Sequence, residues 1–353
     1  MPFCLIGLGS NQGNRQHLLE TASARIAAES QVRIIALSPW HETTPIGGPP
    51  GQPLFLNGAL TIKTSLSPQQ LLALLLQIER DFGRQREERW ASRSLDLDLL
   101  LYDDLVLDTP SLQLPHPRMA WRRFVLEPAA EVAGAMIHPT IGWTVTRLLE
   151  HLNSAPRYIA IAGPIAVGKS HLARRLAESL SARLITEKPN WQHLTAFYND
   201  PTGHGWQMEL EFLNQRALLL AAILQPAQGM LPTGESCWTV SDFWFDQSRA
   251  FARTWLPPGQ LPAFIEQWQE KRLGVIQPKL LVHLDAPAEM LLARLRARNR
   301  SCEQQLTEEQ LERIRQAIFD EVSQPNVGPV LRLNNDDHDA IFAEVLAAVQ
   351  GME

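Results

Sequence analysis

The chain contains 353 residues, of which 45% are hydrophobic and 20% charged, so it is long enough for two domains and too apolar for wholesale disorder. Residues 1–156 carry 13 Lys and Arg against 15 Asp and Glu, and the remainder carries 19 against 23. Nothing in this balance suggests the basic face that nucleic-acid binding requires, so we expect no nucleic-acid partner. The three cysteines are dispersed, and no basic leader follows Met1, so we expect a cytoplasmic protein. The longest apolar run, residues 71–76, is too short to span a membrane.

The first half alternates between strand-like and helix-like segments. Apolar runs predict strands at residues 3–8, 32–38, 54–64 and 95–102. Helices are predicted at residues 14–28, opened by Asn11, and at 68–82, with Ser67 as N-cap. A further apolar-periodic segment covers residues 144–152 and closes this half.

A turn-rich stretch at residues 153–156 separates the two halves. Residues 158–162 directly after it have the pattern of a buried strand that leads into a glycine-rich loop and a helix. This order is typical of the start of a new α/β unit. We therefore predict two domains, 1–156 and 157–353.

The most informative stretch of the first half is residues 83–100. Asp96 and Asp98 lie two apart in a predicted strand, so both carboxylates point to one face, where they suit Mg²⁺. A carboxylate pair alone would favour a solvated acidic edge. However, residues 84–93 contain four arginines, whose guanidinium groups match phosphate oxygens. Together these groups predict a phosphoryl-transfer site.

Five blocks in the first half follow one another in the order seen in a known family. They are residues 7–11, 42–47, 55–57, 89–98 and 114–124. With these blocks the chain resembles 6-hydroxymethyl-7,8-dihydropterin pyrophosphokinase, an enzyme of folate biosynthesis, over residues 3–152. The resemblance implies a ferredoxin-like α+β sandwich, two Mg²⁺ ions, and transfer of diphosphate from ATP to the pterin with release of AMP.

The resemblance also implies roles for single residues. Asp96 and Asp98 would hold both metal ions, and Arg84 and Arg93 would contact the transferred group. The surroundings of ATP would comprise Glu79, Arg86, Arg89, Trp90, His116 and Arg122. The pterin would lie between Phe55 and Phe124, with Trp90 nearby, and its edge would be read by Asn57 and the backbone of Thr43, Thr44 and Ile46. Taken singly, Phe55 and Phe124 are more often core residues.

Residues 163–170 fit the Walker A pattern, with a predicted strand before them and a helix after them. In such a loop Gly163 and Gly168 allow the backbone N–H groups to surround phosphate. Lys169 would reach the terminal phosphates, and Ser170 would bind Mg²⁺. The pattern predicts nucleotide binding by the second half.

Residues 157–350 resemble the bacterial deoxynucleoside kinases, more diffusely than the first half resembles its family. The resemblance implies a P-loop parallel-sheet α/β kinase-like domain that uses ATP. It makes Glu187 the catalytic carboxylate and residues 205–216 the base-reading helix. It also implies an arginine-rich lid that comprises Arg296, Arg298 and Arg300.

Three departures leave the activity of the second half open. Phe243 follows Asp242 where the family has an arginine, and Lys188 is an extra residue between Glu187 and its proline. The base-reading glutamine of the family aligns with Glu209 or with Gln207, and an acid replaces an amide only when it is protonated. The alternative to a deoxynucleoside kinase is a nucleotide-sensing or dimerising module, which would form a homodimer through this half.

Overall fold

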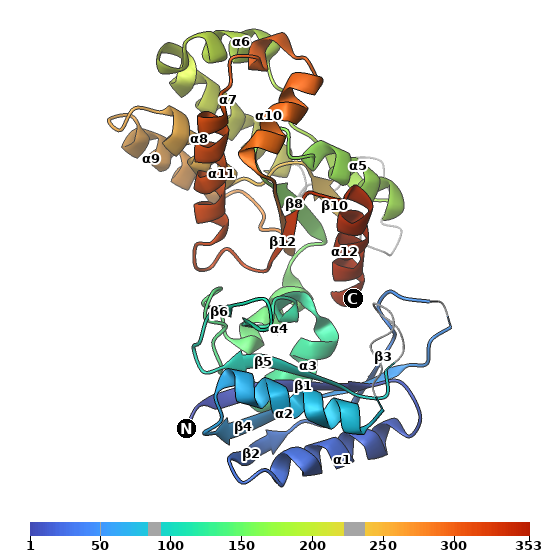
Figure 1. Cartoon of the computed structure of the whole chain (residues 1–353). Helices are drawn as coiled ribbons and strands as arrows, with labels where there is room; N and C mark the ends of the chain where they lie inside the picture. Colours follow the sequence, from blue (N-terminus) through green and yellow to red (C-terminus); the bar gives the residue numbers. More distant parts are fainter. Residues whose placement is uncertain (50, 84–92, 222–236) are drawn as a thin grey trace. The chain divides into compact units, whose positions relative to one another are not determined.

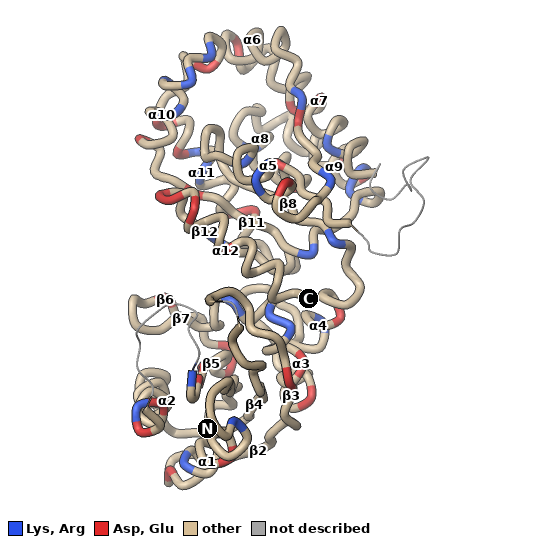
Figure 2. Tube along the Cα trace, turned by 90° about the vertical axis from the view of Figure 1, so that its right-hand side faces the viewer, with Lys and Arg blue, Asp and Glu red and all other residues tan. Residues whose placement is uncertain are grey.

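The computed structural model describes residues 1–49, 51–83, 93–221 and 237–353. They form two compact units, one of Met1–Ser154 with Leu346–Glu353 and one of Ala155–Val345 (Figure 1). Basic and acidic residues lie close together within each unit, for example on the helices α2 (Pro68–Asp81) and α7 (Pro201–Ala221) (Figure 2). None of the described helices is long and apolar enough to cross a membrane.

The first unit is built on an antiparallel sheet with the strand order β2-β4-β1-β5, and β3 pairs with β4. The strands are β1 (Phe3–Ser10), β2 (Val32–Leu37), β3 (His41–Thr43), β4 (Phe55–Thr64) and β5 (Asp96–Tyr102), with the hairpin β6 (Leu107–Asp108) and β7 (Gln113–Leu114). The helices are α1 (Arg15–Ala27), α2, α3 (Arg123–Ala133), α4 (Val145–Ser154) and the short η1 (Met119–Trp121). The chain order β1-α1-β2-β4-α2-β5 is the βαββαβ order of ferredoxin-like folds, as predicted.

The core of the first unit lies between the sheet and the helices α1 and α2, which contact each other. Ser67 caps α2 as predicted, in a capping box with Gln70. On the other helical layer α3 packs on β4 and on α4. The sequence reading did not include α3, because Pro128 in its middle interrupts the helical pattern.

The second unit contains a parallel sheet with the strand order β12-β11-β8-β10-β9, which confirms the predicted P-loop α/β class. Its strands are β8 (Tyr158–Ala162), β9 (Arg183–Ile185), β10 (Thr239–Ser241), β11 (Leu280–Asp285) and β12 (Val330–Asn334). The helices are α5 (Lys169–Ser179), α6 (Trp191–Asn199), α7, α8 (Gln247–Trp255), α9 (Leu261–Arg272), α10 (Ala288–Ala297), η2 (Ser301–Glu303) and α11 (Glu308–Val322). The last helix, α12 (His338–Gly351), begins in this unit, and its residues from Leu346 onward are assigned to the first unit. All five residues of β8 are buried, as expected for a central parallel strand.

Candidate functional sites

Two glycines of β1 lie opposite the two aspartates of β5. In the antiparallel register Gly9 faces Asp96 and Gly7 faces Asp98. On its other side Gly9 faces Asn57 of β4, and a Cβ atom built on Gly9 would lie 3.0 Å from the Asn57 Oδ1 atom. Glycine therefore leaves room for its polar neighbours at this point of the sheet. Three of the five sequence blocks, residues 7–11, 55–57 and 89–98, therefore come together on the neighbouring strands β1, β4 and β5.

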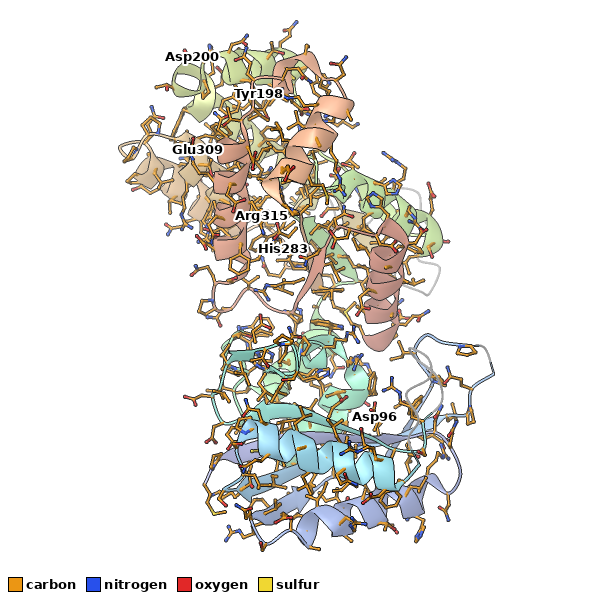
Figure 3. All side chains as sticks on the ribbon, in the orientation of Figure 1. Asp96, Tyr198, Asp200, His283, Glu309 and Arg315 are labelled. Carbon is orange, nitrogen blue, oxygen red and sulfur yellow. The ribbon has the colours of Figure 1, made fainter. Side chains whose placement is uncertain are left out.

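Asp96, which Figure 3 labels, and Asp98 share one face of β5, because they lie two residues apart in the strand. Both are half-buried, whereas Leu97 and Leu99 are buried on the opposite face, as the two-residue period requires. The Arg93 Nη1 atom lies 2.7 Å from the Asp96 Oδ2 atom. Carboxylate oxygens side by side are ligands that Mg²⁺ accepts together with phosphate, so this pair fits a magnesium ion.

The backbone of Arg93 is held by Asn11, which belongs to the first sequence block. The Arg93 N–H donates to Asn11 Oδ1 at 2.7 Å, and the Asn11 N–H donates to the Arg93 carbonyl at 3.1 Å. The expectation that Asn11 opens the first helix is wrong. Asn14 caps α1 instead, with its side chain accepting from the His17 N–H. Asn11 therefore orders the segment that carries Arg93.

Residues predicted to bind the pterin are brought together by β3 and β4. Thr43 faces Phe55 across the two strands, and Asn57 Nδ2 donates to Thr43 Oγ1 at 2.7 Å. Asn57 is buried, so its amide is held in one orientation. Of the other residues predicted to bind the pterin, Thr44 and Ile46 follow β3 in the chain. Phe124 lies in the first turn of α3, and this helix packs on β3 and β4.

A pocket of about 410 Å³ opens beside Asp98 and is lined in part by Glu79 and His116. The buried Glu79 accepts the Leu97 N–H at 2.8 Å, so it also fixes the strand that carries the aspartates. His116 Nδ1 accepts the Arg118 N–H at 3.2 Å, which leaves the hydrogen of the neutral ring on Nε2. Burial lowers the pKa of His116, while Asp98 raises it and nearby arginines lower it. A neutral donor is therefore available in this pocket.

Arg122 directly precedes α3, and its guanidinium lies 5.5 Å from the centre of the Phe124 ring. Arg84, Arg86, Arg89 and Trp90, the remaining residues predicted for the ATP and pterin site, lie outside the described residues.

In the second unit the loop after β8 has the form that phosphate binding requires. Gly163 and Gly168 have φ angles of 152° and 102°. A Cβ atom on Gly163 would lie 2.4 Å from the Leu284 carbonyl oxygen, and one on Gly168 would lie 2.7 Å from Asn335 Nδ2. Only glycine fits both positions without a clash. The loop is therefore shaped by its glycines.

Lys169 and Ser170 begin α5 at the end of this loop. Lys169 Nζ donates to the carbonyl oxygens of Gly163 and Pro164, both at 2.8 Å. Burial lowers the pKa of Lys169 to about 8, against the carboxylates of Glu187 and Asp242, which raise it. At neutral pH the lysine is therefore a cation that can exchange its loop carbonyls for phosphate oxygens.

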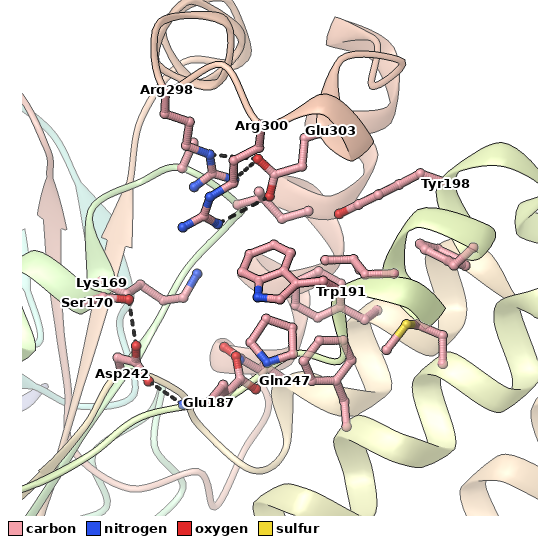
Figure 4. Close-up of a pocket in the computed structure, with 18 of the residues that line it drawn as sticks. Lys169, Ser170, Glu187, Trp191, Tyr198, Asp242, Gln247, Arg298, Arg300 and Glu303 are labelled. Atoms are coloured by element: carbon pink, nitrogen blue, oxygen red, sulfur yellow. Dashed lines mark hydrogen bonds and ion pairs between the residues drawn. The ribbon is translucent and has the colours of Figure 1, made fainter.

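Asp242 joins the phosphate loop to the segment that carries Glu187. Asp242 Oδ2 accepts from Ser170 Oγ at 2.6 Å, and its Oδ1 accepts the Glu187 N–H at 3.1 Å (Figure 4). Both oxygens of one carboxylate are thereby used to place the Walker serine and the predicted catalytic acid.

Arg216 of α7 is the residue that sequence reasoning missed in this unit. It is almost fully buried, its Nε atom lies 2.5 Å from Glu187 Oε1, and its Nη1 donates to Ser248 Oγ at 2.7 Å. Phe243, which stands in the place of the family's arginine, is fully buried and does not line the pocket. The guanidinium beside Glu187 thus comes from another element. In the sequence its only signal was helical spacing, because Arg216 stands three residues after Leu213 and four before Leu220, on the face that both leucines bury.

The extra residue Lys188 is accommodated by the same helix. The Lys188 N–H donates to Gln215 Oε1, and Gln215 Nε2 donates to the Lys188 carbonyl, both at 2.8 Å. Both peptide groups of the inserted residue are therefore paired by one side-chain amide.

The predicted lid arginines divide into two groups. Arg298 and Arg300 line the pocket and form ion pairs with Glu303, and the Arg300 guanidinium lies 4.9 Å from the centre of the Trp191 ring (Figure 4). Arg296 instead donates to backbone carbonyls of residues 304 and 306 and is not among the pocket residues. Arg294 of the same helix lines the pocket instead. The lid role of Arg296 remains a prediction, and Arg296 here contacts the backbone carbonyls of Gln304 and Leu306.

The pocket itself measures about 470 Å³. It reaches from the phosphate loop and Glu187 to the aromatic residues of α6 and α7. Two further buried polar residues line it, Glu209 of α7 and Gln247 of α8. Of the two positions considered for base reading, residue 209 therefore lines the pocket and residue 207 does not.

Two protein-family models match this chain. One describes 7,8-dihydro-6-hydroxymethylpterin-pyrophosphokinase and matches residues 5–134, and the other describes deoxynucleoside kinase and matches residues 159–348.

Curated relatives match the first half. The 2-amino-4-hydroxy-6-hydroxymethyldihydropteridine pyrophosphokinase of Synechocystis sp. is 41% identical over 149 residues, which cover 42% of this chain and 75% of that protein. The protein of the same name from Bacillus subtilis is 46% identical over 127 residues, which cover 36% of this chain and 75% of the relative. Among solved structures, deoxyadenosine kinase from M. mycoides with bound dATP aligns with a TM-score of 0.48 and 16% identity, over 55% of this chain and 99% of that one.

Proposed function

We propose a two-part function for this chain, which belongs to the 7,8-dihydro-6-hydroxymethylpterin-pyrophosphokinase family through its first half and to the deoxynucleoside kinase family through its second. The first half is a diphosphokinase of folate biosynthesis that uses ATP and 6-hydroxymethyl-7,8-dihydropterin. We assign this activity to a domain of residues 1–156 and the second function to residues 157–353.

In the first half the pterin hydroxymethyl oxygen attacks the β-phosphorus of ATP, AMP leaves, and the hydroxyl proton is released. Asp96 and Asp98 would hold Mg²⁺, which neutralises charge on the phosphates when it is bound. The observation that carries this assignment is that both carboxylates share one face of β5, with Arg93 paired to Asp96 and with Asn57 on the other side of Gly9. Arg93 is already oriented by Asn11 and Asp96, so its guanidinium can meet the transferred group without large rearrangement.

The pterin lies next to these carboxylates in our proposal. Asn57 is fixed by Thr43, so its amide can accept and donate at the edge of a flat heterocycle. Phe55 and Phe124 offer rings on which that heterocycle can stack. The pocket beside Glu79 and His116 takes ATP, with the Nε2–H of neutral His116 as a donor.

For the second half we propose ATP-dependent phosphorylation of a deoxynucleoside. Glu187 accepts the proton of the nucleoside hydroxyl as that oxygen attacks the γ-phosphorus, and ADP leaves. Lys169, Arg298 and Arg300 line the same pocket and can stabilise the charge of the transferred group. The observation that supports this proposal is the ion pair between Arg216 and Glu187, because it restores a guanidinium beside the carboxylate.

The alternative for the second half is a nucleotide-sensing or dimerising module. It is favoured by the pairing of Arg298 and Arg300 with Glu303, since lid arginines engaged in this way are not directed at phosphate. The two functions differ in their product. A kinase forms ADP and a phosphorylated nucleoside, whereas a sensor binds ATP without turnover.

Replacing Arg93 with alanine should lower pyrophosphokinase turnover by roughly 10²–10³-fold while changing the apparent pterin affinity little, because its charge acts most strongly in the transition state. The measurement is the rate of AMP formation at varied pterin concentrations. Arg33→Ala, which removes an exposed arginine of β2, is the matched control. A change in apparent pterin affinity alone would make Arg93 a binding residue and contradict the assignment.

Replacing Glu187 with glutamine should lower nucleoside phosphorylation by roughly 10²–10⁴-fold, because the amide cannot accept the hydroxyl proton. ATP binding should persist, since the phosphate loop is unchanged. The assay follows ADP formation by the whole chain with each of the four natural deoxynucleosides, with the exposed Glu178→Gln on α5 as control. If the unaltered chain forms no phosphorylated nucleoside but binds ATP, the second half is the nucleotide-sensing module.

A further inference from the structure

We name residues 44–54, between β3 and β4, the pterin loop, because the backbone of Thr44 and Ile46 is predicted to read the pterin edge. Its glycines have positive φ angles, which are 69° for Gly47, 76° for Gly48 and 83° for Gly51. Glycine adopts such angles without strain, but a glycine-rich segment loses much conformational entropy when it is ordered. The position of this loop therefore depends on the side chains that hold it.

The pterin loop is closed on itself by Gln52. The Gln52 Nε2 atom donates to the Gly47 carbonyl at 3.2 Å and to the Pro49 carbonyl at 3.3 Å. One side chain thus ties the part of the loop that leaves β3 to the part that returns to β4. Displacement of the loop as a whole then depends on its junction with the two strands.

Arg15, the first residue of α1, bridges this junction. Its Nη1 atom donates to the Leu54 carbonyl at 2.7 Å, and its Nη2 atom lies 2.8 Å from Glu42 Oε2. Leu54 is the last residue of the pterin loop, and Glu42 lies in β3. One guanidinium fork therefore joins both strands next to their last pair, Thr43 with Phe55.

The bridge is partly exposed, with 29% of the Arg15 side chain and 51% of the Glu42 side chain accessible to solvent. An ion pair at such exposure contributes little to the stability of a whole domain. Its effect is local, because the neighbouring Thr43 and Phe55 belong to the proposed pterin site and Thr43 accepts from the Asn57 amide. Loss of the bridge should therefore affect pterin binding more than folding.

We propose that Arg15 is a positioning residue of the pterin site, which holds Glu42 and Leu54 together and thereby fixes the strand ends that carry the pterin loop. Arg15 itself contacts no substrate in this arrangement. It lies outside the five sequence blocks, so the family resemblance assigns it no role. The inference rests on the proposed placement of the pterin beside Phe55 and Asn57.

Replacing Arg15 with alanine in the full chain should raise the KM for the pterin by roughly threefold to tenfold, because a hydrogen bond from a charged group and an exposed ion pair are lost. The kcat should change by less than about twofold, since Arg15 contacts no reacting atom. The rate of AMP formation is measured at saturating ATP with varied pterin, and then at saturating pterin with varied ATP. The KM for ATP should stay unchanged.

Calorimetry gives the same comparison without turnover. The pterin is titrated into the full chain with Mg²⁺ and an ATP analogue in which a methylene group replaces the oxygen between the α- and β-phosphates, so that AMP cannot leave. The Kd for the pterin should rise in Arg15→Ala by the same factor as the KM.

Arg25→Ala is the matched control. Arg25 lies on the same helix, and its Nη2 atom lies 2.8 Å from Asp81 Oδ2 in another partly exposed ion pair. Both alanine variants therefore remove an exposed ion pair of α1, and their melting temperatures should fall to a similar small extent. Only Arg15→Ala should change the KM and the Kd for the pterin.

Two further variants separate positioning from a general loss of charge. Arg15→Lys keeps the charge but not the fork, so its KM for the pterin should lie between those of the unaltered chain and Arg15→Ala. Glu42→Ala should raise the KM less than Arg15→Ala does, because the bond to Leu54 remains. Combined with Arg15→Ala, it should add nothing, since both changes break one bridge.

Equal pterin KM and Kd in Arg15→Ala and the unaltered chain would overturn the inference, and so would an equal rise in Arg25→Ala. A lower kcat with an unchanged KM would do the same. The proposed pyrophosphokinase function fails separately. If the unaltered chain binds the pterin but forms no AMP, the calorimetric comparison still decides the role of Arg15. No pterin binding by the unaltered chain would overturn both.

Discussion

Replacing Asp98 with alanine should lower AMP formation from ATP and the pterin by on the order of 10³-fold or more while the fold stays intact. Asp96 and Asp98 share one face of β5, and a single remaining carboxylate cannot hold a metal between two substrates. Asp98 also lines the pocket with His116. Its loss would therefore remove a proposed metal ligand and also change the electrostatics of the pocket that we propose for ATP.

The measurement is chromatographic quantification of AMP, with circular dichroism to confirm folding. Asp104→Ala removes an exposed carboxylate shortly after β5 and should leave the rate unchanged. Raising the Mg²⁺ concentration should not restore the full activity of the Asp98→Ala variant, since the two-carboxylate geometry of Asp96 and Asp98 is lost. Activity within a factor of a few of the unaltered chain would contradict the assignment of this site.

Replacing Lys169 with alanine should abolish ATP-dependent turnover by the second half, lowering nucleoside phosphorylation by more than about 10²-fold. Pyrophosphokinase activity of the same molecule should persist, because its proposed residues all lie in the first half. In the unaltered chain phosphorylation should also decline above pH 8, because burial lowers the pKa of Lys169 to about 8 and the cation is lost.

One sample of each variant serves for both activities, with ADP and AMP as separate readouts. Arg174→Ala, which removes an exposed cation from the same helix, is the control. Unchanged nucleoside phosphorylation in Lys169→Ala would remove the phosphate loop from the mechanism. Loss of both activities would mean that the two halves do not work independently.

Local patterns were enough to predict four strands and the helices α1, α2 and α4 of the first unit, and the strand, loop and helix that begin the second. The two-residue spacing of Asp96 and Asp98 fixes their common face in any strand, and the Walker pattern requires its flanking strand and helix. The observed β5 and α5 have these features. Such features are predictable because they depend on neighbours in sequence.

Other features depend on contacts between distant segments. Arg216 lies beside Glu187 only because α7 packs next to the loop after β9, and no spacing in the sequence indicates this. In the sequence, Phe243 after Asp242 is a departure from the family's arginine. Because Phe243 is fully buried, an arginine there would place an unpaired charge in the core.

The pairing of Lys188 with Gln215 has a consequence for how this domain tolerates changes in length. The inserted residue and the side chain that pairs with it lie 27 positions apart, and each of the two solvent-exposed hydrogen bonds contributes about 1 kcal/mol or less. Deleting Lys188 alone would leave the Gln215 amide to water, and replacing Gln215 alone would leave the Lys188 N–H and carbonyl to water. In a lineage of such proteins, glutamine at the helix position is therefore the permissive substitution, and a graft of this loop into a shorter relative must carry both.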